Sequence, residues 1–292
     1  MEHQLFRGIV QVLSEVNKDA PRVRLRFQDG DIVLAWYWAV IHDRPVSWAT
    51  CRKNWPIWWR KPIPSDSTMS RRLKSARVRQ LLALVERQLT APEQEGVFWK
   101  IDGKPLPIGG CSKDRQAGYG RAAGGKAKGY KLHAITGADG RIAEWRVAPM
   151  NCDERVIAAR LLKTATLQGY VVADANYDSN KLHAICDQRG NLQLVVPRRY
   201  GPQRGTGHRP QTAGRRRSRE ILENPSPEFG RGLLHDRAVI EREYGNLTNW
   251  GGGLSGLPPW IRTHPRVYRW VQAKLALTAL RKQLKTEALC SS

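Results

Sequence analysis

The sequence has little of what marks a secreted, zinc-thiolate or membrane protein. Its five cysteines are scattered, odd in number and free of any C-x-x-C pair, so we expect reduced thiols, no disulfide framework and no zinc site. The longest apolar run, residues 33–41, has nine residues, far fewer than a transmembrane helix needs. The first residues hold no basic segment followed by a long apolar stretch, so we expect no signal peptide.

Acidic residues are scarce relative to basic ones. The 292 residues include 49 Lys and Arg but only 26 Asp and Glu, which gives a net charge of +23 and a pI near 10.4. Such a charge opposes compact folding by self-repulsion and usually has an acidic partner. Nucleic acid is the leading candidate, because each neutralised phosphate releases a counterion and strengthens binding, and a membrane surface is the weaker alternative.

Residues 1–90 are predicted to form a helical module. Residues 31–43 are apolar nearly all round, which is typical of a buried helix, and Pro45 can open a second helix. Ser65 is a favourable cap for a helix over 65–76, and a further helix follows to about residue 89.

Basic side chains concentrate between residues 51 and 79, where nine Lys and Arg accompany one acid. If residues 45–76 form a helix-turn-helix, the last helix of that range can enter a major groove of DNA. The alternative is that this helix only packs within the module and exposes a solvated basic face. The sequence leaves both interpretations open.

Residues 97–285 follow a different pattern, in which short β-branched strands alternate with helical segments. Three strands with hairpin character precede a helix, strand, helix and strand, and two helices follow an insertion, an order typical of a mixed α/β sheet with helices on its faces. The insertion, residues 200–232, is basic, and its aperiodic part over 201–219 predicts a mobile loop. The predicted strands cover 97–102, 128–136, 141–149, 169–174 and 192–197, and the predicted helices cover 153–166, 179–189, 235–250 and 264–285.

Two aspartates follow directly on apolar strands. Asp102 ends the strand that begins at residue 97, and Asp174 ends the run "GYVVAD". A carboxylate at the end of a buried strand is costly unless it is paired or bound to a metal, although Asp174 could simply start a turn. Glu241 lies in the helix predicted over 235–250, beside Val239 and Ile240, so we expect it to be partly buried.

Three carboxylates that converge repel one another unless a cation neutralises them. Oxygen ligands of this kind suit Mg²⁺ or Mn²⁺. Two such ions would activate a water or a 3′-hydroxyl and stabilise the leaving oxygen of a phosphodiester. The spacing alone is weak support, because a chain with 26 acids offers many such triples.

Three sequence blocks give this hypothesis its specificity. The blocks "WKIDG", "VVADANYDSNKL" and "RAVIEREYGNL" resemble the active-site blocks of bacterial insertion-sequence DDE transposases, over roughly residues 97–285. The resemblance implies an RNase H-like catalytic domain, a mixed sheet flanked by helices, preceded by an N-terminal helical, helix-turn-helix-like module. It also implies that Asp102, Asp174 and Glu241 are the catalytic residues and the ligands of two Mg²⁺ (or Mn²⁺) ions.

The third block departs from the family pattern. Many members have a tyrosine three residues before the arginine and a lysine seven after the glutamate, whereas this chain has Leu234 and Thr248 there. Glu243 is therefore a fallback for Glu241, but two residues along a helix point in different directions. Arg237 lies four residues before Glu241, where the resemblance implies a role in positioning DNA or the glutamate. The alternative is a surface ion pair.

Further basic residues are predicted to contact DNA. Residues 113–131 combine glycine with Lys and Arg but lack the phosphate-binding pattern G-x-x-x-x-G-K-S/T, so we interpret them as a DNA-contacting loop. The insertion before the glutamate helix brings flexible arginines that can bind backbone phosphates. The predicted DNA-binding residues are Arg71, Arg72, Lys74, Lys126, Lys128, Arg215, Arg216, Arg217 and Arg237.

The resemblance implies a DNA transposase that binds the terminal inverted repeats of an insertion sequence, cleaves them and joins the 3′ ends to target DNA. It further implies double-stranded DNA as partner, a homodimer as the active complex, and a cytoplasmic, nucleoid-associated location in bacteria without membrane contact. Two alternatives stay open. One is a domesticated or inactive transposase that only binds DNA, and the other is an RNase H-like nuclease acting on RNA or on junctions.

Overall fold

The computed structural model divides into two compact units. The first comprises Met1–Thr90, Leu247–Leu254 and Pro265–Ser292, and the second comprises Ala91–Asn246 and Ser255–His264; we call them the helical unit and the sheet unit. The residues that the structure describes are 1–18, 24–91, 96–109, 112–199, 211–223, 228–235, 238–249, 253–254 and 256–290.

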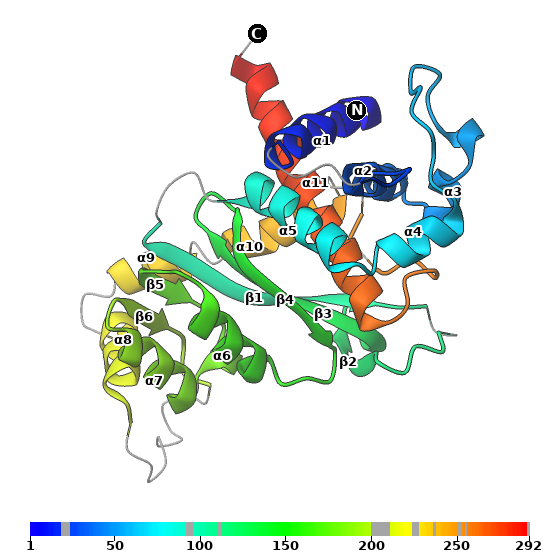
Figure 1. Ribbon diagram of the computed structural model, residues 1–292. Helices are drawn as coiled ribbons and strands as arrows, with labels where there is room; N and C mark the ends of the chain where they lie inside the picture. The colour runs from blue at the N-terminus through cyan, green and yellow to red at the C-terminus, as the bar shows by residue number, and fades with distance from the viewer. Residues whose placement is uncertain are drawn as a thin grey trace. The chain divides into compact units, whose positions relative to one another are not determined.

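The second helix of the helical unit, α2, is buried and packs against α1 and α5 (Figure 1). The sequence predicted that residues 31–43 are a buried helix, and this is confirmed, since every residue from Ile32 to Val40 is buried in α2. Ser65 caps α4 as predicted, with its side chain accepting from the Thr68 amide. The elements are α1 (Glu2–Val16), α2 (Asp29–Ile41), α3 (Val46–Ala49), η1 (Arg52–Asn54), α4 (Asp66–Arg72) and α5 (Ala76–Thr90).

The helix predicted to start at Pro45 is shorter than its pattern suggests. It ends at Ala49, and only one 3-10 turn follows. The indole N–H of Trp55 donates to the Ala49 carbonyl at 2.6 Å, and that of Trp38 donates to the Asn54 carbonyl at 2.9 Å. Stacking of Trp55 on Trp38 holds this arrangement, so long-range aromatic packing overrides the local helical preference.

The last helix, α11 (His264–Cys290), belongs to the helical unit from Pro265 onward, whereas the predicted division placed residues 264–285 with the sheet. Its Trp270 is fully buried and packs edge-on against Trp36, with ring centroids 6.1 Å apart. Lys274 pairs with Asp43 and donates to the Val40 carbonyl at the end of α2. The N-terminal helices and α11 thus share one core.

The sheet unit contains a six-stranded mixed sheet with β1 at its centre. On one side of β1 the pairing is antiparallel to β3, which in turn pairs with β2 and β4; on the other side β5 and β6 run parallel to it. The predicted architecture, a mixed sheet flanked by helices and preceded by a helical module, is confirmed. The strands are β1 (Phe98–Pro107), β2 (Gly118–Ala122), β3 (Gly125–Gly137), β4 (Ile142–Pro149), β5 (Gly169–Val172) and β6 (Leu192–Val195).

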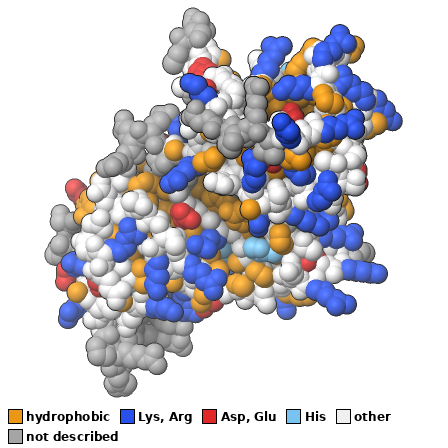
Figure 2. All heavy atoms as spheres, in the orientation of Figure 1, with side chains coloured by type: hydrophobic (Ala, Val, Ile, Leu, Met, Phe, Trp, Pro, Cys, Tyr) orange, Lys and Arg blue, Asp and Glu red, His pale blue; other side chains and the backbone are white. Residues whose placement is uncertain are grey.

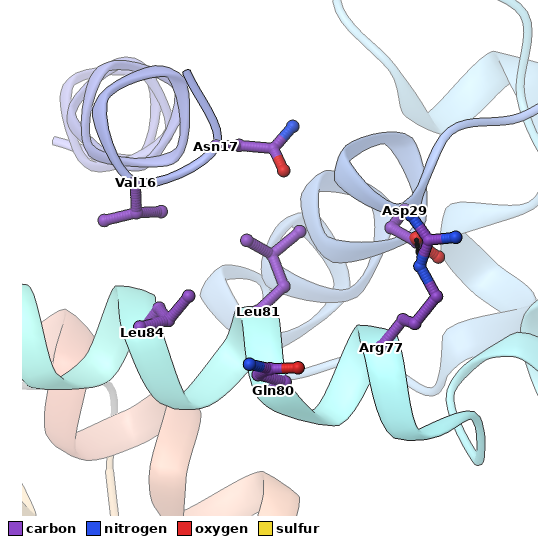
Figure 3. Close-up of a pocket in the computed structure, with 7 residues that line it drawn as sticks. All are labelled: Val16, Asn17, Asp29, Arg77, Gln80, Leu81 and Leu84. Carbon is purple, nitrogen blue, oxygen red and sulfur yellow. Dashed lines mark ion pairs between the residues drawn. The ribbon is translucent and has the colours of Figure 1, made fainter. Parts of the chain in front are cut away.

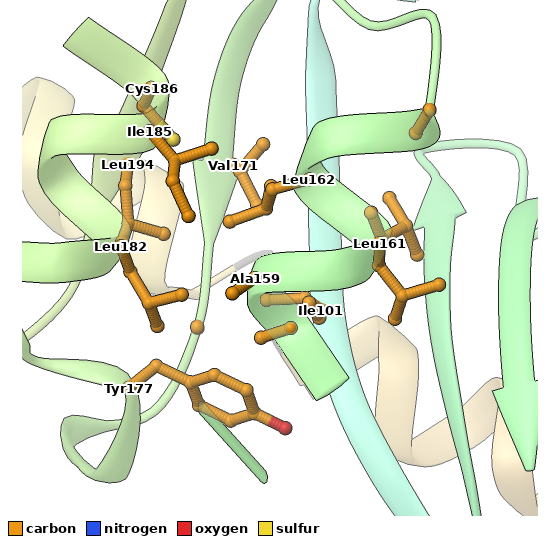
Figure 4. Packing of buried hydrophobic residues seen from close by; sticks show 14 of the residues in the cluster. Ile101, Ala159, Leu161, Leu162, Val171, Tyr177, Leu182, Ile185, Cys186 and Leu194 are labelled. Carbon is orange, nitrogen blue, oxygen red and sulfur yellow. The ribbon is translucent and has the colours of Figure 1, made fainter. Parts of the chain in front are cut away.

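Helices cover both faces of this sheet. One face packs on α6 and α7 through Trp99, Ile101, Val171 and Leu194, the large cluster shown in Figure 4. The alternate positions face α8 and α9, in a smaller cluster with Leu233. The remaining elements are α6 (Glu154–Thr164), η2 (Ala175–Tyr177), α7 (Asn180–Arg189), α8 (Ala213–Glu223), α9 (Glu228–His235) and α10 (Ala238–Asn249).

Two segments predicted as loops are regular structure. Gly118–Ala122 is strand β2, where glycine permits close approach: a Cβ on Gly120 would lie 2.5 Å from the Met150 carbonyl oxygen. Residues 213–223 form α8 instead of a mobile loop, whereas residues 201–210 lie outside the described residues. Within the described chain, no helix has the length and apolar character to cross a membrane.

Candidate active site

Strand register relates Asp102 to Asp174. The parallel pair β1–β5 matches Phe98 with Tyr170 and Lys100 with Val172. Continued by two residues along both chains, this register sets Asp102 opposite Asp174. Neighbouring strands lie about 5 Å apart, so the two carboxylates begin from adjacent backbone positions. Both side chains are half-buried.

The local structure at Asp102 corrects one expectation. Asp102 does not end β1, which continues to Pro107; instead β5, its parallel neighbour, stops beside it at Val172. The Gly103 amide donates to the Asp102 carboxylate at 2.7 Å, which fixes the side chain close to the strand. Asp102 therefore lies just beyond the last residue pair of the parallel strands β1 and β5.

Asp174 does start a turn. It caps η2, with its carboxylate accepting from the Asn176 amide at 2.8 Å and from the Asn176 side chain at 3.3 Å. The turn directs the next residues away from the sheet and brings Tyr177 back into the core. The Asp174 carboxylate thus has local hydrogen-bond partners. Starting the turn does not prevent the same residue from binding a metal.

Two buried tyrosines mark a concentration of negative charge. Burial, and after it the charges of Glu154, Asp102 and Asp174, raise the pKa of Tyr177 well above its ordinary value. Burial and then the charge of Asp102 do the same to the pKa of Tyr244. The Tyr177 hydroxyl has no hydrogen-bond partner among the described residues, and Figure 4 shows it directed away from the aliphatic cluster.

Tyr244 fixes α10 on the central strand. Its hydroxyl donates to the Asp102 carbonyl at 2.8 Å, and Lys104 donates to the Tyr244 carbonyl at 3.4 Å. Glu241 lies in the same helix, three residues before Tyr244, and helical positions three apart share a face. The side chains of Glu241 and Glu243 and the whole of Arg237 lie outside the described residues. Among described side chains, no group of three His, Cys, Asp or Glu could hold a metal.

Sequence reasoning missed three members of this neighbourhood: Tyr177, Tyr244 and Glu154. Glu154 lies in the first turn of α6 and pairs with Lys131 of β3. The sequence did contain a signal for the two tyrosines: one follows Asp174 by three residues and the other follows Glu241 by three. In a helix or turn, residues three apart lie on the same side. Nothing local in the sequence marks Glu154.

The arginines of α8 have structural partners. Arg215 forms a two-pronged ion pair with Asp178, at 2.8 and 2.7 Å, and both side chains are largely buried. Burial alone would raise the pKa of Asp178, but the nearby His183 and Arg215 outweigh it and hold that pKa well below its usual range. Arg217 pairs with Asp187 at 2.8 Å. These two arginines are therefore not the flexible residues that the sequence predicted.

The predicted DNA contacts of α4 also separate into two kinds. Arg72 donates to the Phe27 carbonyl and to Asp29, and its side chain is only 14% exposed. Arg71 and Lys74 are exposed at the end of the same helix. Figure 2 shows Lys and Arg side chains spread widely over one face of the molecule, with few acids among them.

The remaining predicted contacts lie near the β2–β3 hairpin and on α8. Lys126 lies 5.9 Å from the ring centre of Tyr119, and Lys128 donates to the Ser112 carbonyl. Arg216 is exposed on α8.

Comparison with known proteins points to one family. A family model described as transposase DDE domain matches residues 96–256, a range that contains Asp102, Asp174 and Glu241. No curated protein matches. Among solved structures, a piggyBac transposase synaptic complex with hairpin DNA, determined by cryo-EM, is 12% identical. The match covers 94% of this chain and 71% of that chain with a TM-score of 0.49, which does not bear on the chemistry of the site.

Proposed function

Because this chain belongs to the family of transposases with a DDE domain, we propose that it is an active DNA transposase. It binds the terminal inverted repeats of an insertion sequence, cleaves them, and joins the freed 3′-hydroxyls to target DNA. The observation that carries this proposal is the β1–β5 register, which brings Asp102 and Asp174 together although 71 residues separate them in the sequence.

Carboxylates of this kind suit a pair of Mg²⁺ or Mn²⁺ ions. Asp102, Asp174 and Glu241 would hold them, since hard divalent cations prefer carboxylate oxygens. Asp102 and Asp174 both raise the pKa of Tyr177, after burial and the charge of Glu154, so both carboxylates lie near this side chain, as a shared cation would require. When bound, the ions supply Lewis-acid activation of the attacking oxygen and stabilise the leaving one.

The protein's own contribution is to fix these groups. The Gly103 amide and the Asn176 amide each hold one aspartate carboxylate in place. Tyr244 holds α10 against β1, which sets the helix position of Glu241. The Tyr177 hydroxyl is an uncommitted donor beside the acids, and it can stabilise an oxygen that develops negative charge.

The partner is double-stranded DNA, both element ends and target. The net charge of +23 favours a polyanion, and the exposed Arg71 and Lys74 are suited to phosphate contacts. Two element ends must be brought together for strand transfer, so we expect a homodimer in the active complex.

Asp174→Ala separates catalysis from binding. We expect the cleavage rate of the variant to fall by more than roughly 100-fold. Loss of a residue that only hydrogen-bonds to a metal ligand can already cost about that much, and Asp174 would be a ligand itself. DNA binding should survive or improve, because a carboxylate repels phosphate when no cation is present. The measurement is nicking of labelled element-end DNA with Mg²⁺ or Mn²⁺, beside a gel shift on the same samples.

The control is Asp139→Asn, which removes an exposed carboxylate in the turn between β3 and β4. It should cleave like the wild type. Undiminished cleavage by Asp174→Ala, or full activity in a chelator, would refute the metal mechanism. Tight binding by a wild type that cleaves under no metal would instead favour the domesticated DNA-binding protein.

A further inference from the structure

Five basic side chains gather on one part of the helical unit. Lys74 and Arg71 are exposed at the end of α4, and Arg79 is exposed in the first turns of α5. Arg266 and Arg269 come from α11, almost 200 residues later in the sequence. We refer to Arg71, Lys74, Arg79, Arg266 and Arg269 as the α4–α5–α11 basic surface.

Arg269 ties the two parts of this surface together. Its guanidinium donates to the carbonyl of Leu73, the C-terminal cap of α4, at 2.6 Å. Its Nε atom has no hydrogen-bond partner among the described residues. The contact places the beginning of α11 directly beside the turn between α4 and α5.

Like charges face one another here. Burial, followed by the charges of Arg266 and Arg79, lowers the pKa of Arg269. Across the residues that the structure describes, no acid forms an ion pair with any member of the basic surface. Such a group of arginines is electrostatically unfavourable unless an anion binds it.

Two neighbouring arginines of the helical unit, Arg72 and Arg77, do have an acidic partner. Arg72 is taken up by Asp29 and the Phe27 carbonyl, and Arg77 pairs with Asp29 at 3.2 Å. Figure 3 shows Arg77 turned toward Asp29 beside a cavity of about 340 Å³, lined also by Leu81 and Leu84. Unlike Arg72 and Arg77 beside them, the residues of the basic surface have no acidic partner among the described residues.

We propose that the α4–α5–α11 basic surface binds the phosphate backbone of duplex DNA, and that Arg266 and Arg269 complete it from the far end of the sequence. This inference rests on the proposed function and deepens it. The DNA-binding surface is not contained in residues 1–90, and Arg72 is a positioning residue for α2 and α4 and not a DNA contact.

The test uses the full chain with Arg79→Gln combined with Arg266→Gln. Neither side chain forms a hydrogen bond or ion pair with the described residues that the change would break, and Arg269 keeps its bond to Leu73. The probe is a mixed-sequence 30-base-pair duplex, because phosphate contacts do not depend on sequence. Each lost contact lowers the slope of log affinity against log salt by about 0.9, so the double variant should lose about 1.8 from that slope. Its affinity near 0.1 M salt should fall on the order of tenfold to 100-fold.

The matched control removes the same charge elsewhere. Arg87→Gln with Arg160→Gln changes two exposed arginines, one eight residues beyond Arg79 on α5 and one on α6. It should keep the wild-type slope. Wild-type affinity and slope in the Arg79/Arg266 variant would overturn the proposal, as would an equal loss in the control, which would show an effect of net charge alone.

The two proposals fail in different ways. If only the basic surface is misassigned, the wild type still cleaves element ends and Asp174→Ala still abolishes cleavage. If the transposase proposal is wrong, the wild type cleaves no element end under any metal, whatever the Arg79/Arg266 variant does to binding.

Discussion

Two arginine-rich regions of the molecule have similar compositions and opposite surroundings. On α8, Arg215 pairs with Asp178, just before α7, and Arg217 pairs with Asp187 of α7. On the α4–α5–α11 basic surface, Arg79 and its neighbours have no described acidic partner. The net charge of the chain is therefore divided into cations that stabilise the fold and cations available to a polyanion. Only the three-dimensional pairing distinguishes them.

The largest expected effect concerns the buried pair on α8. Asp178→Ala should destabilise the protein by about 3–5 kcal/mol, because it leaves Arg215 buried without a counter-charge. Glu223→Ala is the matched control, since Glu223 and its partner Arg198 are 43% and 30% exposed, and it should cost no more than about 1 kcal/mol. Urea unfolding measures both. Equal losses in the two variants would remove the distinction between a buried and an exposed pair.

The same pair predicts a specific dependence of stability on pH. The pKa of Asp178 is lower in the folded state than its ordinary value near 3.9, so the unfolded state binds more protons in acid. Its contribution is complete above about pH 5 and is lost as the pH falls toward the folded pKa. The difference in unfolding free energy between wild type and Asp178→Asn should therefore shrink below about pH 4. A difference that stays constant from pH 7 to pH 3 would contradict the assignment.

The smallest expected effect is on DNA binding, and it compares one arginine of α8 with one arginine of the α4–α5–α11 basic surface. Arg217→Gln should change duplex-DNA affinity by less than about twofold, since that side chain is committed to Asp187 and Gln193. Arg79→Gln alone should lower the salt slope by about 0.9. Salt titrations of both single variants provide the comparison. A larger slope change for Arg217 than for Arg79 would assign DNA contact to α8.

Patterns that are local in the sequence predicted much of the fold. The β-branched runs identified β1, β3, β4, β5 and β6, and the end of β5 drew attention to Asp174 because a carboxylate rarely follows a buried strand without a reason. Glycine misled the prediction at β2, where it permits close packing and does not signal a loop.

The rest of the site depends on contacts between distant segments. The register between β1 and β5, the bond from Tyr244 to Asp102 and the pairing of Arg215 with Asp178 each join residues far apart in the chain. No local periodicity encodes them. Whether an arginine near residue 216 binds phosphate or a carboxylate is decided by which acid the fold places beside it.

The position of α11 has a consequence for the ribosome-bound chain. Trp36 and Asp43 of α2 are synthesised early, but their partners Trp270 and Lys274 follow the entire sheet unit. Domains generally form as units while the chain emerges, and the helical unit cannot do so until translation has passed α11. A product truncated within the sheet unit would leave the apolar side of α2 uncovered and would lack Arg266 and Arg269. We therefore expect chains cut short by a premature stop to aggregate more readily than the intact protein and to bind DNA more weakly.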